Sequence, residues 1–261
     1  MPADSTAQTP TATPTILKLG GSVITDKDSP ETVNDAALDR AVDAIADASD
    51  QSGSSLVIVH GGGSFGHIHA AEYGVSTTEG SHDLEAVTTI HGAMKQLNRV
   101  VVDRLGSAGV PAVPVHPLSA ASRDAAGELS LSATAVSGLL DEGFVPVLHG
   151  DVIAHAGKGV SVLSGDEVVT TLATSLGASR VGLCSTVPGV LDDDDEVIET
   201  IRDFESVASV LGASESTDVS GGMAGKVREL LALATPACVF GPDDVSDFLA
   251  GGEPGTRIER R

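Results

Sequence analysis

Short apolar runs that end in glycines, alternating with segments of helical periodicity, constrain the fold of this chain more than any other feature. Residues 16–19 and 56–59 are two such runs, rich in residues that favour strands. The first ends in Gly-Gly-Ser at 20–22 and the second in His-Gly-Gly-Gly-Ser at 60–64. Between them, residues 34–48 carry apolar side chains at the spacing of one helix face. This pattern predicts buried parallel strands that are joined by a helix.

The alternation continues along the rest of the sequence. We predict further strands at 112–115, 145–148, 180–184 and 237–240, and a hairpin formed by 152–154 and 160–163. We predict further helices at 84–105, 131–140, 167–176, 204–211, 223–233 and 245–250. This order indicates an α/β fold with a mostly parallel sheet and helices on both faces. Ligands of such sheets bind beyond the carboxyl ends of the strands, where the glycine loops fall.

The charge balance excludes several classes of function. Lysine and arginine together number 15 against 37 aspartates and glutamates, so the formal net charge is −22. A surface of this sign repels nucleic acids and anionic membranes, so we predict neither as a partner. The carboxylates are spread along the whole chain, and their mutual repulsion needs screening by salt. We therefore infer adaptation to a salt-rich cytoplasm.

Other features of the composition also favour a cytoplasmic protein. The two cysteines, Cys184 and Cys238, are too few for a disulfide framework or a thiolate metal site. No apolar run reaches the roughly 18 residues that span a bilayer. Residues 1–14 are rich in threonine, alanine and proline, and we predict that they form a disordered tail and not a signal peptide.

Lysine is scarce, and two of the five lysines flank the first glycine loop. Lys18 directly precedes that loop, and Lys27 lies nine residues further on. Ammonium groups beside a glycine turn would hold the negative charge of a phosphoryl group during its transfer. The alternative is that both are solvated lysines beside an ordinary turn.

The second glycine loop predicts a phosphate cradle, because its three glycines precede a helix whose N-terminus attracts anions. His67 lies about one turn inside that helix and could donate a hydrogen bond to an oxyanion of a substrate. The alternative is a capping or packing histidine. We interpret His60, which ends the preceding strand, as structural.

Two later loops combine glycine with a charged residue. Asp166 lies at the start of a helix, where it either caps that helix or orients Lys18 and Lys27 through ion pairs. Lys226 lies one turn into a helix that begins with Gly-Gly at 221–222. It could hold the terminal phosphates of a nucleotide, and the alternative is a surface lysine.

Together these loops predict a site for two phosphorylated molecules, or for one nucleotide and a second anion. A Gly-Asp pair at 150–151 follows another predicted strand and adds to the same edge. The sequence has no Walker A loop, and no His-Glu-x-x-His or Cys-x-x-Cys motif. We therefore predict no metal ligands in the protein, and expect Mg²⁺ to be bound through nucleotide phosphates.

Five motifs in this order resemble the amino acid kinase superfamily. They are Lys-Leu-Gly-Gly-Ser at 18–22, Gly-Gly-Gly-Ser-Phe-Gly-His at 61–67, Leu-His-Gly-Asp-Val at 148–152, Ser-Gly-Asp at 164–166 and Gly-Gly-Met-x-x-Lys at 221–226. Within that superfamily, the second and third motifs are similar to those of isopentenyl phosphate kinases. The resemblance covers roughly residues 15–260. It implies an open αβα sandwich, a homodimer, and transfer of the γ-phosphoryl group of ATP, with Mg²⁺, to isopentenyl phosphate.

The resemblance also implies a role for individual residues. Catalytic roles fall to Lys18, Lys27, His67 and Asp166. ATP contacts fall to Lys18, Gly20, Gly21, Ser22, Gly63, Asp166, Gly221 and Lys226. Contacts to the phosphate that accepts the phosphoryl group fall to Gly62, His67 and Gly150.

We expect two lobes that share one continuous sheet: residues 15–176 bind the acceptor and residues 177–261 bind the nucleotide. The loop at 184–190 resembles the nucleoside-binding loop of the family, although Thr186 stands where aspartate is common. The apolar tail of the acceptor has several candidate contacts, which are Phe65, Ile68, Ala71, Tyr73, Ile90, Met94 and Leu97. Two other functions stay open: a kinase of this fold that acts on a different small phosphate, phosphonate or carboxylate, and a nucleotide sensor without catalysis.

Overall fold

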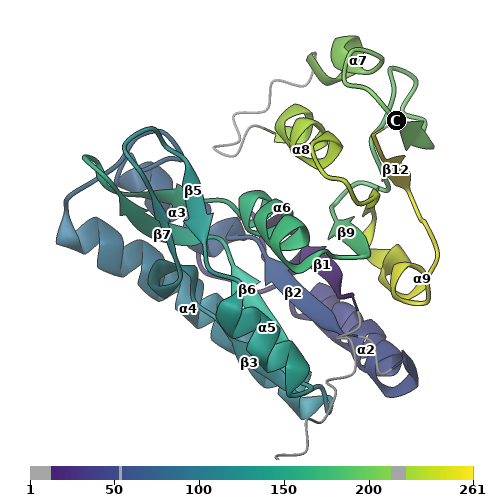
Figure 1. Ribbon diagram of the computed structural model, residues 1–261, viewed down its shortest axis with the longest axis horizontal. Helices are drawn as coiled ribbons and strands as arrows, with labels where there is room; N and C mark the ends of the chain where they lie inside the picture. The colour runs from purple at the N-terminus through teal and green to yellow at the C-terminus, as the bar shows by residue number, and fades with distance from the viewer. Residues whose placement is uncertain (1–12, 53–54, 213–221, 261) are drawn as a thin grey trace, which may run out of the picture.

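The computed structural model describes residues 13–52, 55–212 and 222–260, and within them a sheet of eight strands crosses the molecule (Figure 1). Its strands lie in the order β10-β12-β11-β9-β1-β2-β6-β3. Their bounds are Thr15–Leu19 for β1, Leu56–His60 for β2, Ala112–Pro114 for β3, Val145–His149 for β6, Arg180–Cys184 for β9, Thr200–Ile201 for β10, Ala237–Phe240 for β11 and Thr256–Ile258 for β12. Neighbours are parallel, except that β11 and β12 pair antiparallel. The mostly parallel sheet that the sequence predicts is confirmed.

Helices cover both faces of this sheet, because each strand directs alternate side chains to opposite faces. Ile16 of β1 belongs to one apolar core cluster, whereas Leu17 and Leu19 belong to another on the opposite face of the sheet. The helix bounds are Gly21–Ile24 for α1, Asp35–Ser52 for α2, Gly63–Glu72 for α3, Leu84–Ser107 for α4, Thr134–Asp141 for α5, Gly165–Leu176 for α6, Ala208–Gly212 for α7, Gly222–Leu231 for α8 and Val245–Leu249 for α9. The result is the αβα arrangement that we expected.

A second sheet of four strands, in the order β5-β4-β7-β8, lies beside the first (Figure 1). Its strands are β4 Ala121–Arg123, β5 Leu129–Leu131, β7 Asp151–His155 and β8 Gly159–Leu163. The predicted hairpin is present as β7 and β8, but the sequence does not predict β4 and β5, because three residues are too few to show a period. We expected one continuous sheet. The eight-stranded sheet takes strands from both predicted lobes, and the four-stranded sheet is additional to it. The lobe boundaries stay a prediction.

Two predicted helices begin later in the structure. The helix predicted at 131–140 begins at Thr134, because Leu129–Leu131 form β5 instead. The helix predicted at 204–211 is reduced to Ala208–Gly212. The residues before it form a turn instead, in which the Ser206 N–H donates to the side chain of Asp203. Among the described residues, no helix combines the length and apolar character needed to cross a membrane.

Candidate active site

A cavity of about 310 Å³ lies at the edge of the large sheet where β1, β2, β6 and β9 end. The segments that follow all four strands contribute to its lining. The predicted site residues that line it are Lys18, Gly20, Gly21, Ser22, Lys27, Gly62, Gly63, His67, Gly150, Asp166 and Lys226. Gly221, also predicted, lies outside the described residues, and its neighbour Gly222 lines the cavity. The structure therefore brings these loops together, while their roles stay predictions.

Two ammonium groups meet on one carboxylate at the wall of this cavity. Lys18 lies between Leu17 and Leu19, so its side chain faces the opposite side of the sheet, where α6 begins. Its Nζ lies 2.6 Å from Oδ1 of Asp166, and Nζ of Lys226 lies 2.8 Å from Oδ2 of the same residue. The expected ion pair with Lys18 is present, and Lys226 is the second partner where the sequence predicts Lys27. The alternative role of Asp166 as the helix cap is wrong, because Ser164 caps α6.

Burial and charge together set the protonation of this cluster. Burial alone raises the pKa of the Asp166 carboxyl, but the charges of Lys18 and Lys226 outweigh it and hold that pKa well below its ordinary value. Burial lowers the pKa of Lys18, and Asp166 only partly offsets this effect. Asp166 is therefore a fixed anion whose charge favours the charged form of a buried lysine beside the cavity.

Glu229 lies behind the cluster, three residues after Lys226 on α8. Burial, and then the charges of Asp166 and Glu167, raise the pKa of its carboxyl to about 7. Its Oε2 is buried and has no hydrogen-bond partner in the part of the chain that the structure describes. The folded protein therefore holds this proton to a higher pH than the unfolded chain does.

Glu229→Gln is expected to raise the melting temperature at pH 8 more than at pH 5. The folded-state pKa lies above the ordinary value of 4.5, so the wild-type chain loses stability as pH rises from about 4.5 to about 7, and the glutamine variant does not. Thermal unfolding of both proteins at fixed salt across this range measures the difference. Parallel curves would show that Glu229 titrates normally.

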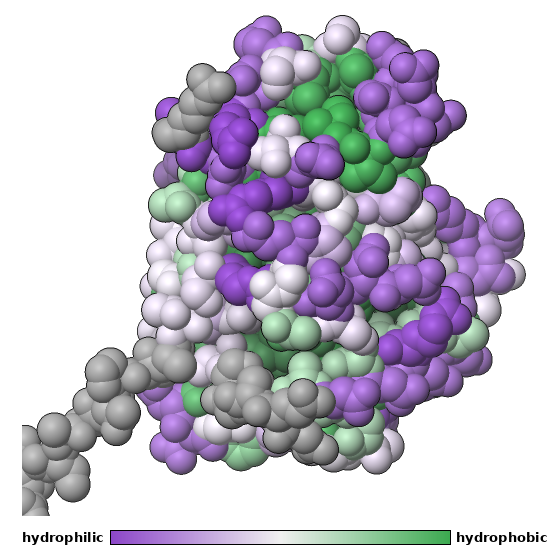
Figure 2. All heavy atoms as spheres, turned by 90° about the vertical axis from the view of Figure 1, so that its right-hand side faces the viewer, coloured by the Kyte–Doolittle hydropathy of each residue, from purple (hydrophilic) through white to green (hydrophobic). Residues whose placement is uncertain are grey.

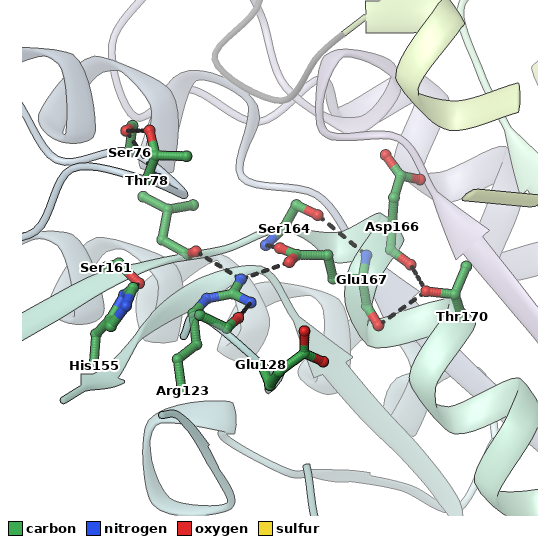
Figure 3. A network of polar contacts seen from close by, with 12 residues as sticks. Ser76, Thr78, Arg123, Glu128, His155, Ser161, Ser164, Asp166, Glu167 and Thr170 are labelled. Carbon is green, nitrogen blue, oxygen red and sulfur yellow. Dashed lines mark hydrogen bonds and ion pairs between the residues drawn. The ribbon is translucent and has the colours of Figure 1, made fainter. Parts of the chain in front are cut away.

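A capping box and an arginine fix the start of α6, and with it Asp166 (Figure 3). The Ser164 hydroxyl accepts from the Glu167 N–H at 3.1 Å, and Oε2 of Glu167 accepts from the Ser164 N–H at 2.9 Å. Oε1 of Glu167 accepts from Arg123 of β4 at 2.5 Å. The four-stranded sheet thus holds the first turn of α6, where Asp166 forms ion pairs with both lysines.

The first two glycine loops pack backbone against backbone. A Cβ on Gly21 would lie 2.2 Å from the nitrogen of Gly63, and a Cβ on Gly63 would lie 2.0 Å from Oγ1 of Thr25. Gly63 also has a φ of +48°, which side chains other than glycine rarely adopt. The Thr25 hydroxyl donates to the carbonyl of Gly21 at 2.8 Å and accepts from the Ser64 N–H at 3.0 Å. Thr25 therefore joins the two loops at the cavity.

The rest of the lining divides by chemistry. Lys27 and His67 are exposed side chains that line the cavity, His67 from the second turn of α3. An apolar portion is formed by Ala70, Ile90, Met94, Val162 and Leu163. Among the candidates for contact with an apolar tail, Ile90 and Met94 line the cavity, whereas Phe65 and Leu97 are buried in the core beneath α4. Thr186 lines it together with Ser185 and Val187.

The sequence does not predict a role for three residues that support this site. Thr25, Arg123 and Glu229 act on partners that lie 39, 44 and 63 residues away, as the bonds to Ser64 and Glu167 and the electrostatic effect of Asp166 show. No local pattern marks such residues, because their role depends on which distant segment the fold brings near.

Comparison with known proteins gives consistent matches. The model of the Amino acid kinase family matches residues 13–240. Isopentenyl phosphate kinase of Haloferax volcanii is 61% identical over 243 residues, which cover 93% of this chain and 97% of that protein. Isopentenyl phosphate kinase of Methanothermobacter thermautotrophicus is 41% identical over 268 residues, with 93% and 98% covered. A crystal structure of an isopentenyl phosphate kinase superposes with a TM-score of 0.80 at 34% identity, covering 94% of this chain and 99% of that one.

Proposed function

The chain belongs to the amino acid kinase family, and from this premise we propose that it transfers the γ-phosphoryl group of ATP to isopentenyl phosphate, giving isopentenyl diphosphate. The observation that carries the proposal is a single cavity with charged and apolar parts. Lysines and glycine loops suit two phosphate groups, and Ile90, Met94 and Val162 suit the short hydrocarbon tail of the acceptor. Relatives named for this activity, aligned over more than nine-tenths of the chain, support the same substrate.

The chemistry fits the groups present. An oxygen of the acceptor phosphate, already ionised at neutral pH, attacks the γ-phosphorus, and the bond to the bridging oxygen of ADP breaks. No general base is needed, so the demand on the protein is to bring two anions together. We assign this task to Lys18, Lys27 and Lys226, with His67 and the N–H of Gly62 on the acceptor phosphate. Asp166 is a positioning residue that orders two of the lysines.

The nucleotide is assigned to the other side of the cavity. Gly20, Gly21, Ser22 and Gly63 would contact its phosphates, and Gly150 would lie near the acceptor. These four residues lie in the predicted acceptor-binding lobe at 15–176, whereas Lys226 and Thr186 lie in the predicted nucleotide-binding lobe at 177–261, so the nucleotide would contact both lobes. The loop that contains Thr186 would lie against the nucleoside.

Mg²⁺ would be held by the nucleotide. Among the described residues, two carboxylates line the cavity, but both oxygens of Asp166 bind lysines, and both oxygens of Asp151 lie 3.0 Å from Nδ1 of His91. Within the described residues, no group of three or more histidines, cysteines or carboxylates is arranged to hold a metal. The ion would supply neutralisation of charge on the ATP phosphates.

A panel of acceptors tests the substrate assignment. The purified protein is incubated with ATP, Mg²⁺ and high salt, together with isopentenyl phosphate, UMP, glutamate or no acceptor, and ³¹P NMR follows ADP and product. We expect a diphosphate from isopentenyl phosphate. Preference for UMP or glutamate would show that the protein is another kinase of this fold. ATP binding without turnover would favour a nucleotide sensor.

We further propose a homodimer in a salt-rich cytoplasm, and the salt dependence has a direct test. Hydrophilic side chains are spread over the face that Figure 2 shows, and the formal net charge is −22. Repulsion acts over about 10 Å at 0.1 M salt but only about 3 Å at 1 M. If screening relieves ~2 kcal/mol, the melting temperature rises by roughly 4–8 °C between these concentrations. A melting temperature that does not change with KCl would refute the adaptation.

A further inference from the structure

Two histidines occupy equivalent places in neighbouring strands, directly beside the cavity. His60 ends β2 and His149 ends β6, and the two residues are partners in the register of the sheet. Both are fully buried, and their rings stack with centroids 5.5 Å apart. Each is followed by a glycine, Gly61 or Gly150, that lines the cavity. Neither histidine has a part in the function proposed above.

The hydrogen bonds of the two rings determine where their protons lie. Nδ1 of His60 is 3.0 Å from the carbonyl oxygen of Gly61, and Nδ1 of His149 is 2.7 Å from that of Gly150. A carbonyl oxygen can only accept, so in each ring Nδ1 carries the proton. Burial lowers the pKa of His60 to about 4 and that of His149 to about 3, which keeps both rings neutral. Nε2 of each neutral ring is then an acceptor.

Both acceptor nitrogens meet a donor. Nδ2 of Asn98 lies 3.1 Å from Nε2 of His60, and Nδ1 of His116 lies 2.9 Å from Nε2 of His149. The orientation of the Asn98 amide is supported by Val147, whose carbonyl oxygen lies 3.4 Å from the same Nδ2. The Asn98 amide therefore requires the same proton position in His60 as the Gly61 carbonyl does, and Nε2 of His149 accepts from His116 when the His116 ring carries its proton on Nδ1.

We propose that His60 and His149 are positioning residues for the phosphoryl acceptor, each donating Nδ1–H to the carbonyl of the glycine that follows it. The inference rests on the proposed kinase function. A peptide group is planar, so fixing the carbonyl of Gly61 also fixes the N–H of Gly62 on the opposite side. The Gly150 N–H bonds the carbonyl of His60 at 3.1 Å, which joins the two loops into one rigid edge.

The cost of the arrangement argues against packing alone. Oδ1 of Asn98 is buried without a hydrogen-bond partner among residues 13–52, 55–212 and 222–260, and an unpaired buried acceptor destabilises the folded state. Two positions before the histidines, and on the same face of the sheet, Ile58 and Val147 belong to the apolar core, so apolar side chains would fill this region without that cost. Such side chains, however, would supply no hydrogen-bond donors to the two glycine carbonyls.

Paired substitutions separate the donor from the shape of the ring. The amide nitrogen of asparagine replaces Nδ1 in position, whereas that of glutamine replaces Nε2. In His60→Asn and His149→Asn, kcat/KM for isopentenyl phosphate is expected to stay within about threefold of wild type, and in the glutamine variants to fall roughly 10- to 100-fold. KM for ATP is expected to change little in all four. Equal losses in asparagine and glutamine variants, or losses shared with ATP, would overturn the proposal.

His155 provides a matched control. It is also buried, and its Nδ1 lies 2.9 Å from the Ser161 hydroxyl in the four-stranded sheet, away from the cavity lining (Figure 3). His155→Asn and His155→Gln are expected to keep the wild-type kcat/KM for the acceptor. A drop in the His155 variants equal to that of the His60 and His149 glutamine variants would show that any buried histidine gives the effect, and would overturn the proposal.

The proton positions can be read without any assay of activity. Long-range ¹H–¹⁵N NMR spectra of the wild-type protein, assigned with the asparagine variants, are expected to show the Nδ1–H tautomer for both rings at pH 7. An Nε2–H tautomer at either residue would overturn the inference, even if a glutamine variant does not fold. Failure of the wild-type protein to phosphorylate isopentenyl phosphate would instead refute the proposed function, so the two failures are distinguishable.

Discussion

Lys27→Ala is expected to lower kcat by about 100- to 1,000-fold, while the affinity for ATP changes by less than about threefold. Lys18 and Lys226 are bound to Asp166 and are already ordered before any ligand arrives. Lys27 is exposed and lines the same cavity from the segment after α1. Its ammonium group can therefore follow the charge of the phosphoryl group in transfer. Steady-state kinetics and calorimetric titration with ATP measure the two effects separately.

Lys95→Ala is the control for the loss of a lysine from this acidic chain. Lys95 is exposed on α4 and does not line the cavity, so its removal is expected to leave kcat unchanged. Loss of ATP affinity as large as the loss of kcat in Lys27→Ala would assign Lys27 to ground-state binding. That result would favour a nucleotide sensor over a kinase.

The parts of the fold that the sequence predicts are those with continuous apolar runs. The central strands, β1, β2, β6, β9 and β11, are buried on both faces, so each leaves a short, mostly apolar run that ends at a glycine or at a polar loop. The strands β4, β5, β10 and β12 have two or three residues each, and they depend on pairing with neighbours that are already formed. Their positions follow from the tertiary structure, and no periodicity marks them.

The candidate site follows the same division. Glycine loops at strand ends are visible in the sequence, and parallel strands place them at one edge, so the cavity is predictable from local signals. The choice of Lys226 as the second partner of Asp166 is not, because it depends on how α8 packs against α6. The roles of His60 and His149 are also invisible locally. A histidine at the end of an apolar strand is interpreted as structural until the carbonyl oxygens and hydrogen-bond donors that contact its ring are known.

Asp166→Asn is expected to destabilise the protein by about 3–5 kcal/mol and to lower kcat/KM for both substrates at least ~100-fold. The Asp166 side chain is 9% exposed and that of Lys18 is 10% exposed, so the substitution leaves a buried ammonium without its carboxylate. Burial already lowers the pKa of Lys18, and the largest opposing effect is the charge of Asp166. Denaturant unfolding and kinetics at pH 7 measure the two losses.

The activity of the variant should also depend more steeply on pH than that of the wild type. Without the carboxylate, the pKa of Lys18 falls further, so Lys18 loses its proton as pH rises and regains it as pH falls. The residual activity of Asp166→Asn is therefore expected to decrease from pH 6 to pH 9 relative to wild type. Adding Lys18→Met removes the buried charge, and this double variant should recover part of the stability but none of the activity. If the double variant were as active as the single one, Lys18 would have no place among the groups that hold the phosphates.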